Sequence, residues 1–153
     1  MGDDKPKILI FSTAYLPLVG GAELAVKEIT DRIGEFDFDL VAARLNSKFP
    51  KREKIGNVNV FRVGWGNILD KFLFPVAGFK LASKLHKEKK YSMIFSLMAS
   101  YAGTAAWLFK GKFSKIPLLV NLQEGRNFNS FFWGKSFFFS KILKSADYVV
   151  AIS

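Results

Sequence analysis

Lys7–Ser12, with the sequence KILIFS, is an apolar run of the length of a buried β-strand and stands almost at the start of the chain. The loop that follows it reaches Gly20 and Gly21, and the residues after these read as a helix from about Glu23 to Ile33. A strand, a loop and an amphipathic helix in this order are the first part of a crossover unit. The opening of the chain therefore favours an α/β fold.

The rest of the chain repeats this alternation of short apolar runs and amphipathic stretches. Further strands are predicted at residues 38–45, 58–63, 93–98, 116–122 and 148–152. Further helices are predicted at residues 75–89, opened by Pro75, at 101–109 and at 130–145, whereas 46–57 reads as a polar, basic loop. Alternating strands and helices build a parallel sheet with helices on both faces. The sequence thus predicts one doubly wound, Rossmann-like α/β domain over residues 1–153.

Composition narrows the classes of protein that remain. The chain has 153 residues, of which 50% are hydrophobic and 24% charged, so it can bury a core. It has no cysteine, which excludes disulfides, cysteine-based zinc sites and thiol catalysis, and fits a reducing cytoplasm. We find no secretory signal and no run of about 20 apolar residues. The net charge of +10 calls for an anionic partner: nucleic acid, anionic lipid or a phosphate-bearing ligand.

The paired glycines before the first helix allow two interpretations. Glycines at a helix start let a phosphate approach exposed backbone N–H groups, but Gly20 and Gly21 can equally form only a tight turn. Their spacing does not match the GxGxxG dinucleotide fingerprint, and no GxxxxGK[ST] motif occurs in the chain. A phospho-receiver domain would carry acidic residues just after the first strand, but Asp3 and Asp4 come before it.

Several pieces of the chain together carry a resemblance. The first strand leads through Tyr15–Pro17 (YLP) to Gly20–Glu23 (GGAE), residues 93–96 (MIFS) form the fourth strand, and residues 145–153 (SADYVVAIS) close the chain. In this order they resemble the retaining, family-4-type glycosyltransferases of the GT-B fold. The resemblance implies that residues 1–153 are the N-terminal, acceptor-side domain, one of the two domains of that fold. The C-terminal donor domain and its E-x7-E motif are absent from the sequence.

The resemblance also implies a reaction. A sugar, of the hexosyltransferase type, would move from a nucleotide-sugar donor to an acceptor with retention of configuration. The nucleotide-sugar would be a co-substrate, and no other cofactor and no metal would be needed. Because the half that binds the donor is missing, the fragment alone is expected to be inactive. A second hypothesis, of a different class, is a non-catalytic membrane- or glycan-binding module that keeps this fold and tolerates changes at the glycine loop.

Candidate site residues follow from the resemblance. By this reading Gly20 and Gly21 approach the donor diphosphate when the two domains close. The residues predicted to bind the donor diphosphate or the acceptor are Gly20, Gly21, Glu23, Gln123 and Arg126. Glu124, after the fifth predicted strand, is the candidate catalytic residue that accepts the acceptor's proton, and equally it can pair with Arg126 as loop structure. The family commonly places a histidine near the acceptor, but the only one here, His86, lies in a lysine-rich helix, where a solvated role is expected.

Two predicted helices carry basic and aromatic side chains outside their core-facing arcs. The predicted membrane-contact residues are Phe79, Lys80, Lys84, Lys87, Trp133, Phe137, Lys141 and Lys144. Such helices bind anionic lipid, which predicts a cytoplasmic protein held peripherally on the inner face of a membrane. A lipid-linked or envelope-glycan acceptor, as in polysaccharide biosynthesis, would suit that place. Alternatively, the two aromatics in 130–145 pack on the missing domain and the lysines are a solvated face. No nucleic-acid module is present, so no nucleic-acid partner is expected.

Overall fold

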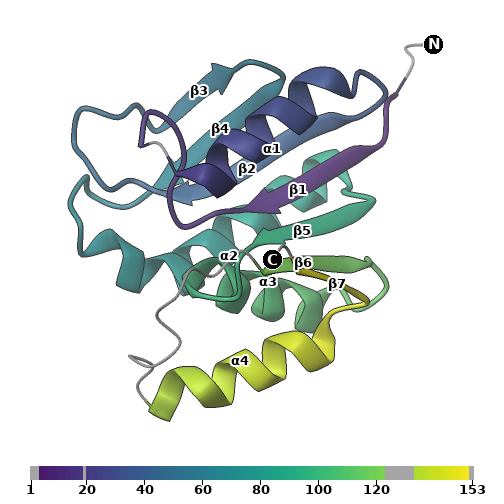
Figure 1. The fold of residues 1–153 in the computed structure, drawn as a ribbon. Coiled ribbons are helices and arrows are strands. Elements are labelled where there is room, and N and C mark those ends of the chain that lie inside the picture. The colour runs from purple at the N-terminus through teal and green to yellow at the C-terminus, as the bar shows by residue number, and fades with distance from the viewer. Residues whose placement is uncertain (1–3, 19, 123–132, 152–153) are drawn as a thin grey trace.

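The fold is a seven-stranded sheet with helices on both faces (Figure 1). It is seen in a computed structural model that describes residues 4–18, 20–122 and 133–151, except the side chains of residues 133–138. The strand order is β3-β4-β2-β1-β5-β6-β7. The predicted strands are β1 (Lys7–Phe11), β2 (Asp37–Ala43), β4 (Val58–Val63), β5 (Met93–Leu97), β6 (Leu118–Leu122) and β7 (Tyr148–Ala151). All of them pair in parallel, so the predicted fold class is confirmed.

The helices form two unequal layers. They are α1 (Gly21–Arg32), α2 (Asp70–Lys89), α3 (Tyr101–Lys112) and α4 (Trp133–Ser145). Because successive side chains of a strand point to opposite faces, Leu9 and Phe11 pack in the core under α2, α3 and α4, whereas Ile8 and Ile10 face α1. The core under three helices includes the edge-to-face pair of Phe11 and Phe109, with ring centroids 5.9 Å apart. The described part of the other face is covered by α1 alone.

One strand lies where the sequence predicts a loop. β3 (Arg52–Ile55) pairs antiparallel with β4 at the edge of the sheet. The turn between them contains Gly56, whose φ of +58° favours glycine. The loop prediction for 46–57 is wrong at this point because β3 is mostly charged, which is common for edge strands and lacks the alternation of a half-buried strand.

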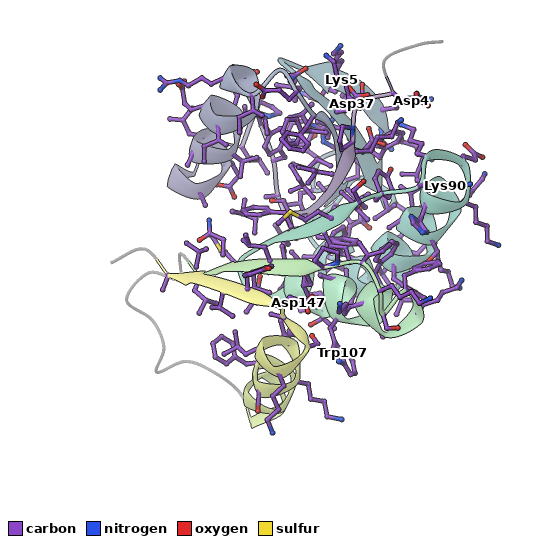
Figure 2. The ribbon with its side chains drawn as sticks, turned by 90° about the vertical axis from the view of Figure 1, so that its right-hand side faces the viewer. Asp4, Lys5, Asp37, Lys90, Trp107 and Asp147 are labelled. Carbon is purple, nitrogen blue, oxygen red and sulfur yellow. The ribbon has the colours of Figure 1, made fainter. Side chains whose placement is uncertain are left out.

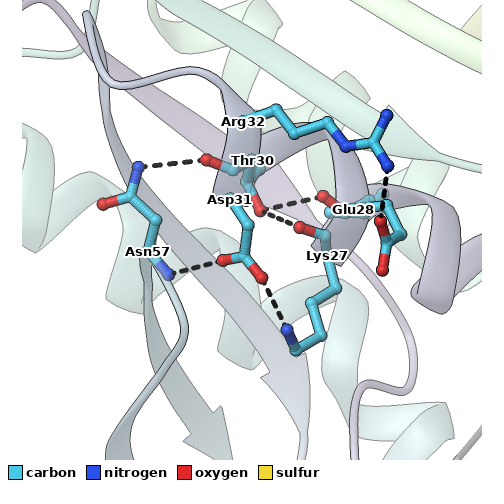
Figure 3. A network of polar contacts seen from close by, with 7 residues as sticks. Lys27, Glu28, Thr30, Asp31, Arg32 and Asn57 are labelled. Carbon is cyan, nitrogen blue, oxygen red and sulfur yellow. Dashed lines mark hydrogen bonds and ion pairs between the residues drawn. The ribbon is translucent and has the colours of Figure 1, made fainter.

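The turn between β3 and β4 also closes the C-terminal end of α1 (Figure 3). The Asn57 side-chain amide donates to the carbonyl oxygens of Thr30 at 3.0 Å and Ile33 at 3.2 Å, and its backbone N–H donates to the Asp31 carboxylate at 3.0 Å. Lys27 pairs with the same carboxylate. These bonds occupy carbonyl groups that a helix end leaves unpaired, and they fix α1 against the sheet.

Helix α2 begins earlier than predicted. It starts at Asp70, and Pro75 lies inside it instead of opening it. The Asp70 carboxylate accepts the backbone N–H of Gly66 at 2.7 Å and of Asn67 at 3.1 Å, which holds the turn that starts the helix. Pro75 removes only one intrahelical N–H close to that start, so the helix continues through it.

His86 is a structural residue and not the solvated one that the sequence predicts. Its ring packs against those of Phe113 at 4.5 Å and Phe109 at 5.6 Å between centroids. Its Nδ1 accepts the backbone N–H of Tyr91 at 3.0 Å, just after α2 ends. Burial, and to a smaller extent the charge of Lys90, lowers the pKa of His86 below its usual value. The neutral ring is thus the form that the fold needs.

We expect the stability of the protein to fall as pH drops through the histidine range. A histidine with a lowered folded-state pKa takes up a proton more readily in the unfolded state. Its contribution to the free energy of unfolding is therefore complete above about pH 6.5 and is lost as the pH falls below that value. The sequence has one histidine, so His86→Gln, which keeps a hydrogen-bond acceptor, should flatten the profile between about pH 7 and 5. Urea unfolding of both proteins at several pH values measures this. Parallel profiles would contradict it.

The closing motif of the chain has a structural explanation. Asp147 lies at the amino edge of the sheet, which Figure 2 shows together with Asp37 and Lys90. Its carboxylate accepts the Leu118 backbone N–H at 2.8 Å and pairs with Lys110 at 2.9 Å. The hydrogen bond from Lys110 and that N–H lower the pKa of Asp147. Asp147 therefore joins β6, β7 and α3 at the edge opposite to the strand carboxyl ends.

Candidate functional site

The carboxyl ends of the parallel strands meet at the edge where α1 and α3 begin (Figure 1). From the central strand β1 the chain moves to β2 on one side, while β5 lies on the other, so strand order reverses between β1 and β5. Open α/β sheets bind ligands at this position. The segments that follow β1 and β5 are joined there, since the Ala102 N–H in the first turn of α3 donates to Thr13 Oγ1 at 3.2 Å.

The glycine loop ends at an uncapped helix N-terminus. Gly20 is the N-cap residue of α1, with extended φ and ψ of −124° and 164°, and no side chain caps the first turn. The Gly20 carbonyl accepts the first intrahelical bond, from Leu24 at 3.1 Å. The N–H groups of the first turn therefore have no intrahelical partner, and the helix dipole makes this end attractive to an anion.

The two glycines differ in how open they are. A Cβ placed on Gly21 would meet nothing within 4 Å, so the space beside it is free among the described residues. A Cβ on Gly20 would collide with the carboxylate of Glu23, which folds back over the helix start. An anion that reaches Gly20 has to displace this carboxylate, whereas Gly21 is open. The loop therefore offers an approach at Gly21.

A buried arginine holds the glycine loop in place. Arg62 in β4 is 4% exposed, and its guanidinium donates to the carbonyl oxygens of Leu16 at 2.6 Å and Pro50 at 3.0 Å. It also forms an ion pair with Glu53 in β3. A planar guanidinium has donors for all three acceptors at once. Arg62 thus fastens the start of the glycine loop to the β3–β4 hairpin.

Buried polar atoms of three residues near this edge have no hydrogen-bond partner among the described residues. They are the hydroxyl of Tyr15, in the glycine loop, Oδ1 of Asp70, at the start of α2, and Oδ1 of Asn121, near the carboxyl end of β6. Burial, followed by the charges of Asp31 and Glu23, raises the pKa of Tyr15 to about 12, so the hydroxyl stays protonated. Buried polar groups are normally paired, so each of these atoms calls for a partner other than the described residues, such as a buried water molecule.

The structure brings only part of the predicted site into view. Gly20, Gly21 and Glu23 lie together at the start of α1. Gln123, Glu124 and Arg126 lie outside the described residues. In the described part of the chain, no group of three or more His, Asp or Glu side chains is placed to hold a metal ion.

The predicted membrane residues are also only partly described. Lys80, Lys84, Lys87, Lys141 and Lys144 are exposed. Phe79 is partly buried against the core, with Lys112 above its ring at 5.8 Å, so it does not stand out on the lysine face as predicted. The projection of this helix from the sequence places Phe79 on the exposed face because it takes no account of α3, which packs closely on α2. The side chains of Trp133 and Phe137 lie outside the described ones, and no helix among the described residues is both long and apolar enough to span a bilayer.

Sequence reasoning missed three residues at this edge. Thr13 joins the loops after β1 and β5, Arg62 holds the glycine loop, and the buried Oδ1 of Asn121 has no hydrogen-bond partner in the described part of the chain. Arg62 left a signal, since it is the only charged residue in the strand VNVFRV. Thr13 left none, because a single polar residue after a strand is common, and Asn121 stood out only as the first residue of the polar cluster that continues to Arg126.

Comparison with known proteins gives one relative in sequence and several in structure. The chain is 27% identical, over 97% of its length, to an uncharacterized glycosyltransferase of Methanocaldococcus jannaschii. It is therefore homologous to a glycosyltransferase, and it spans 42% of that relative's length. No protein-family model matches the chain.

Solved structures agree on the fold. A sucrose-phosphate synthase from Thermosynechococcus elongatus superimposes with a TM-score of 0.76 at 15% identity, covering 95% of this chain and 42% of that one. The apo form of UGT2 from Phytolacca americana superimposes with a TM-score of 0.53 at 10% identity over 76% of this chain and 29% of that one. At such identities the likeness concerns the fold, which is that of part of a GT-B glycosyltransferase.

Proposed function

We propose that this chain is the acceptor-side, N-terminal domain of a glycosyltransferase that transfers a sugar from a nucleotide-sugar to a glycan or lipid-linked acceptor with retention. The observation that carries the proposal is the open N-terminus of α1 at Gly21. It lies at the carboxyl end of the central strand, in a chain homologous to a glycosyltransferase. This is where an open α/β sheet binds ligands, and where backbone N–H groups attract phosphate.

In this mechanism the glycine loop acts on the leaving group. As the bond between sugar and diphosphate breaks, negative charge grows on the diphosphate oxygens. The N–H groups of the first turn of α1, held in position by Arg62 through Leu16, would stabilise that charge without having to reorganise. The role of Glu124 as the group that accepts the acceptor's proton remains part of the proposal.

Two exposed apolar surfaces support the presence of further polypeptide around this domain. Strand β7 exposes Tyr148, Val149 and Val150, although parallel strands are normally covered on both faces. Beside α1 an apolar groove of about 290 Å³ lies between Ile29 and Phe95. Such surfaces are usually covered in a complete protein. A donor-binding half would supply the cover.

The mass of the native polypeptide tests this two-domain proposal. An immunoblot of the source cells with an antibody against this domain should show a chain of roughly 300 residues or more, which is two domains of ordinary length. A band at the size of the 153-residue chain would contradict the two-domain proposal. It would favour either a separate donor-binding subunit or a non-catalytic binding module.

A further inference from the structure

A patch of large apolar side chains stands exposed between the end of β4 and the first turns of α2. Its members, with their exposed fractions, are Trp65 (76%), Ile68 (60%), Leu69 (63%), Phe72 (57%), Leu73 (44%) and Val76 (54%). We call them the apolar ridge. Their spacing of three to four residues puts them along one side of the helix and of the turn that leads into it. A contiguous exposed patch of this kind marks an interaction surface.

The ridge is held by specific hydrogen bonds. The Asp70 carboxylate accepts two N–H groups of the preceding loop, and the Asn67 side chain accepts the Leu69 N–H at 2.9 Å. Gly66 has a φ of +100°, and a Cβ there would be 2.5 Å from the Ser47 backbone. A side chain at Gly66 is therefore excluded, and the loop can approach residue 47 closely. The exposure of the apolar side chains is thus part of the fold and not fraying of a helix end.

The exposed charges beside the ridge are basic. Lys51 and Lys80 line a groove of about 390 Å³ together with Trp65, Leu73 and Val76 of the ridge, and the acidic residue that also lines it, Asp70, is buried. Between residues 44 and 87 the basic residues are Arg44, Lys48, Lys51, Arg52, Lys54, Arg62, Lys71, Lys80, Lys84 and Lys87.

The acidic residues of the same segment do not offset this charge. They are Glu53, which is paired with Arg62, and Asp70, which is 1% exposed and bound to its own loop. Lys51 and Lys80 therefore border the ridge, and this segment holds no exposed acidic residue. An apolar patch of Trp, Phe, Leu and Ile bordered by lysines is complementary to an anionic bilayer, which has an apolar interior and negative headgroups.

We propose that the apolar ridge inserts into the surface of an anionic membrane, with the lysines around it on the headgroups. This surface differs from the one that the sequence predicts, since Lys80 is the only predicted residue that lines the groove beside the ridge. The ridge follows the carboxyl end of β4, at the same edge of the sheet as the glycine loop (Figure 1). If the proposed function holds, docking brings the candidate site next to a lipid-linked acceptor. The binding itself does not depend on that function.

Sedimentation of the native polypeptide with vesicles tests the ridge. Wild-type protein should bind vesicles that contain phosphatidylglycerol more strongly than pure phosphatidylcholine vesicles, and the binding should fall as salt rises. The double variant Trp65→Ser/Phe72→Ser should lower the partition coefficient by about tenfold or more, since two exposed apolar side chains no longer insert. These side chains lie outside the core, so circular dichroism should show an unchanged fold.

Matched control variants distinguish binding through the ridge from nonspecific binding through other exposed side chains. Ile29→Ser removes an apolar side chain that is 56% exposed in this domain, and should leave vesicle binding unchanged because Ile29 lies in the groove that we expect further polypeptide to cover. Lys51→Gln/Lys80→Gln should weaken binding to anionic vesicles, whereas Lys112→Gln/Lys115→Gln, at the end of α3 and in the loop before β6 on the opposite edge, should not. In a background in which Trp107, Trp133 and any tryptophan outside residues 1–153 are replaced by Phe, the emission of Trp65 should shift to shorter wavelength on binding.

Three results would overturn the proposal: wild-type protein that binds neither vesicle type, ridge variants that bind like wild type, or wild-type protein that self-associates through the ridge instead. Failure of the sugar-transfer proposal is distinguishable, because Gly21→Val should bind vesicles like wild type whatever its activity.

Discussion

Gly21→Val is expected to lower the rate of sugar transfer by the native enzyme by about a hundredfold or more, the usual effect of losing a preorganised donor to a developing negative charge. The valine side chain would occupy the open space beside the first turn of α1, through which the diphosphate must approach the N–H groups. The fold should tolerate it, since a Cβ at Gly21 meets no atom within 4 Å. Steady-state kinetics and thermal unfolding of the same preparation measure both effects.

Gly34→Val is the matched control for this variant. Gly34 follows α1 and precedes β2, at the opposite edge of the sheet, and a Cβ there also meets nothing within 4 Å. Its turnover should equal that of wild type. Unchanged kinetics in Gly21→Val would remove the glycine loop from the mechanism, and an equal loss in both variants would point to a general effect on folding.

Arg62→Leu is expected to lower the free energy of unfolding by about 3 kcal/mol, because removing one member of a buried ionic network leaves its partners unpaired. Those partners are Glu53 and the carbonyl groups of Leu16 and Pro50. Chemical denaturation of the variant and of wild type measures the difference. In the native enzyme we also expect slower turnover, since the glycine loop loses its attachment to β4.

Arg32→Leu provides the comparison for Arg62. Arg32 also forms an ion pair, with Glu28, but its side chain is 80% exposed, and such pairs contribute little to stability. Its loss should change the unfolding free energy by less than about 0.5 kcal/mol. Equal effects of the two substitutions would show that Arg62 is not the residue that joins the loop to the hairpin.

Much of the fold was predictable because parallel strands that are buried on both faces appear in the sequence as short, continuous apolar runs. The apolar run at residues 7–12 shows this, since β1 is Lys7–Phe11. Val58–Val63 was predicted from its alternating pattern instead, and its bounds agree with those observed. β3 was missed because a charged edge strand has the same composition as a loop. The start of α2 was missed because its initiating contact joins Asp70 to the loop before it, and Pro75 is the more conspicuous sequence signal.

The candidate site was predictable only where its chemistry lies in the backbone. Gly20 and Gly21 could be found because glycine itself is the signal at a helix start. His86 was assigned to solvent because the aromatic rings around it come mainly from α3, far away in sequence. The apolar ridge was missed because most of it lies between the predicted strand at 58–63 and the predicted helix at 75–89, and only the packing shows that nothing in the described chain covers its side chains.

Transfer by the native polypeptide is the most direct test of the central claim. Purified protein would be incubated with individual nucleotide-sugars and a lipid extract from its own cells. Nucleoside diphosphate release would be followed alongside mass spectrometry of the lipids. We predict that one nucleotide-sugar gives time-dependent release together with a product heavier by one sugar, and that Gly21→Val loses both. Folded wild-type polypeptide that transfers no sugar from any nucleotide-sugar, or equal activity in Gly21→Val, would contradict the account.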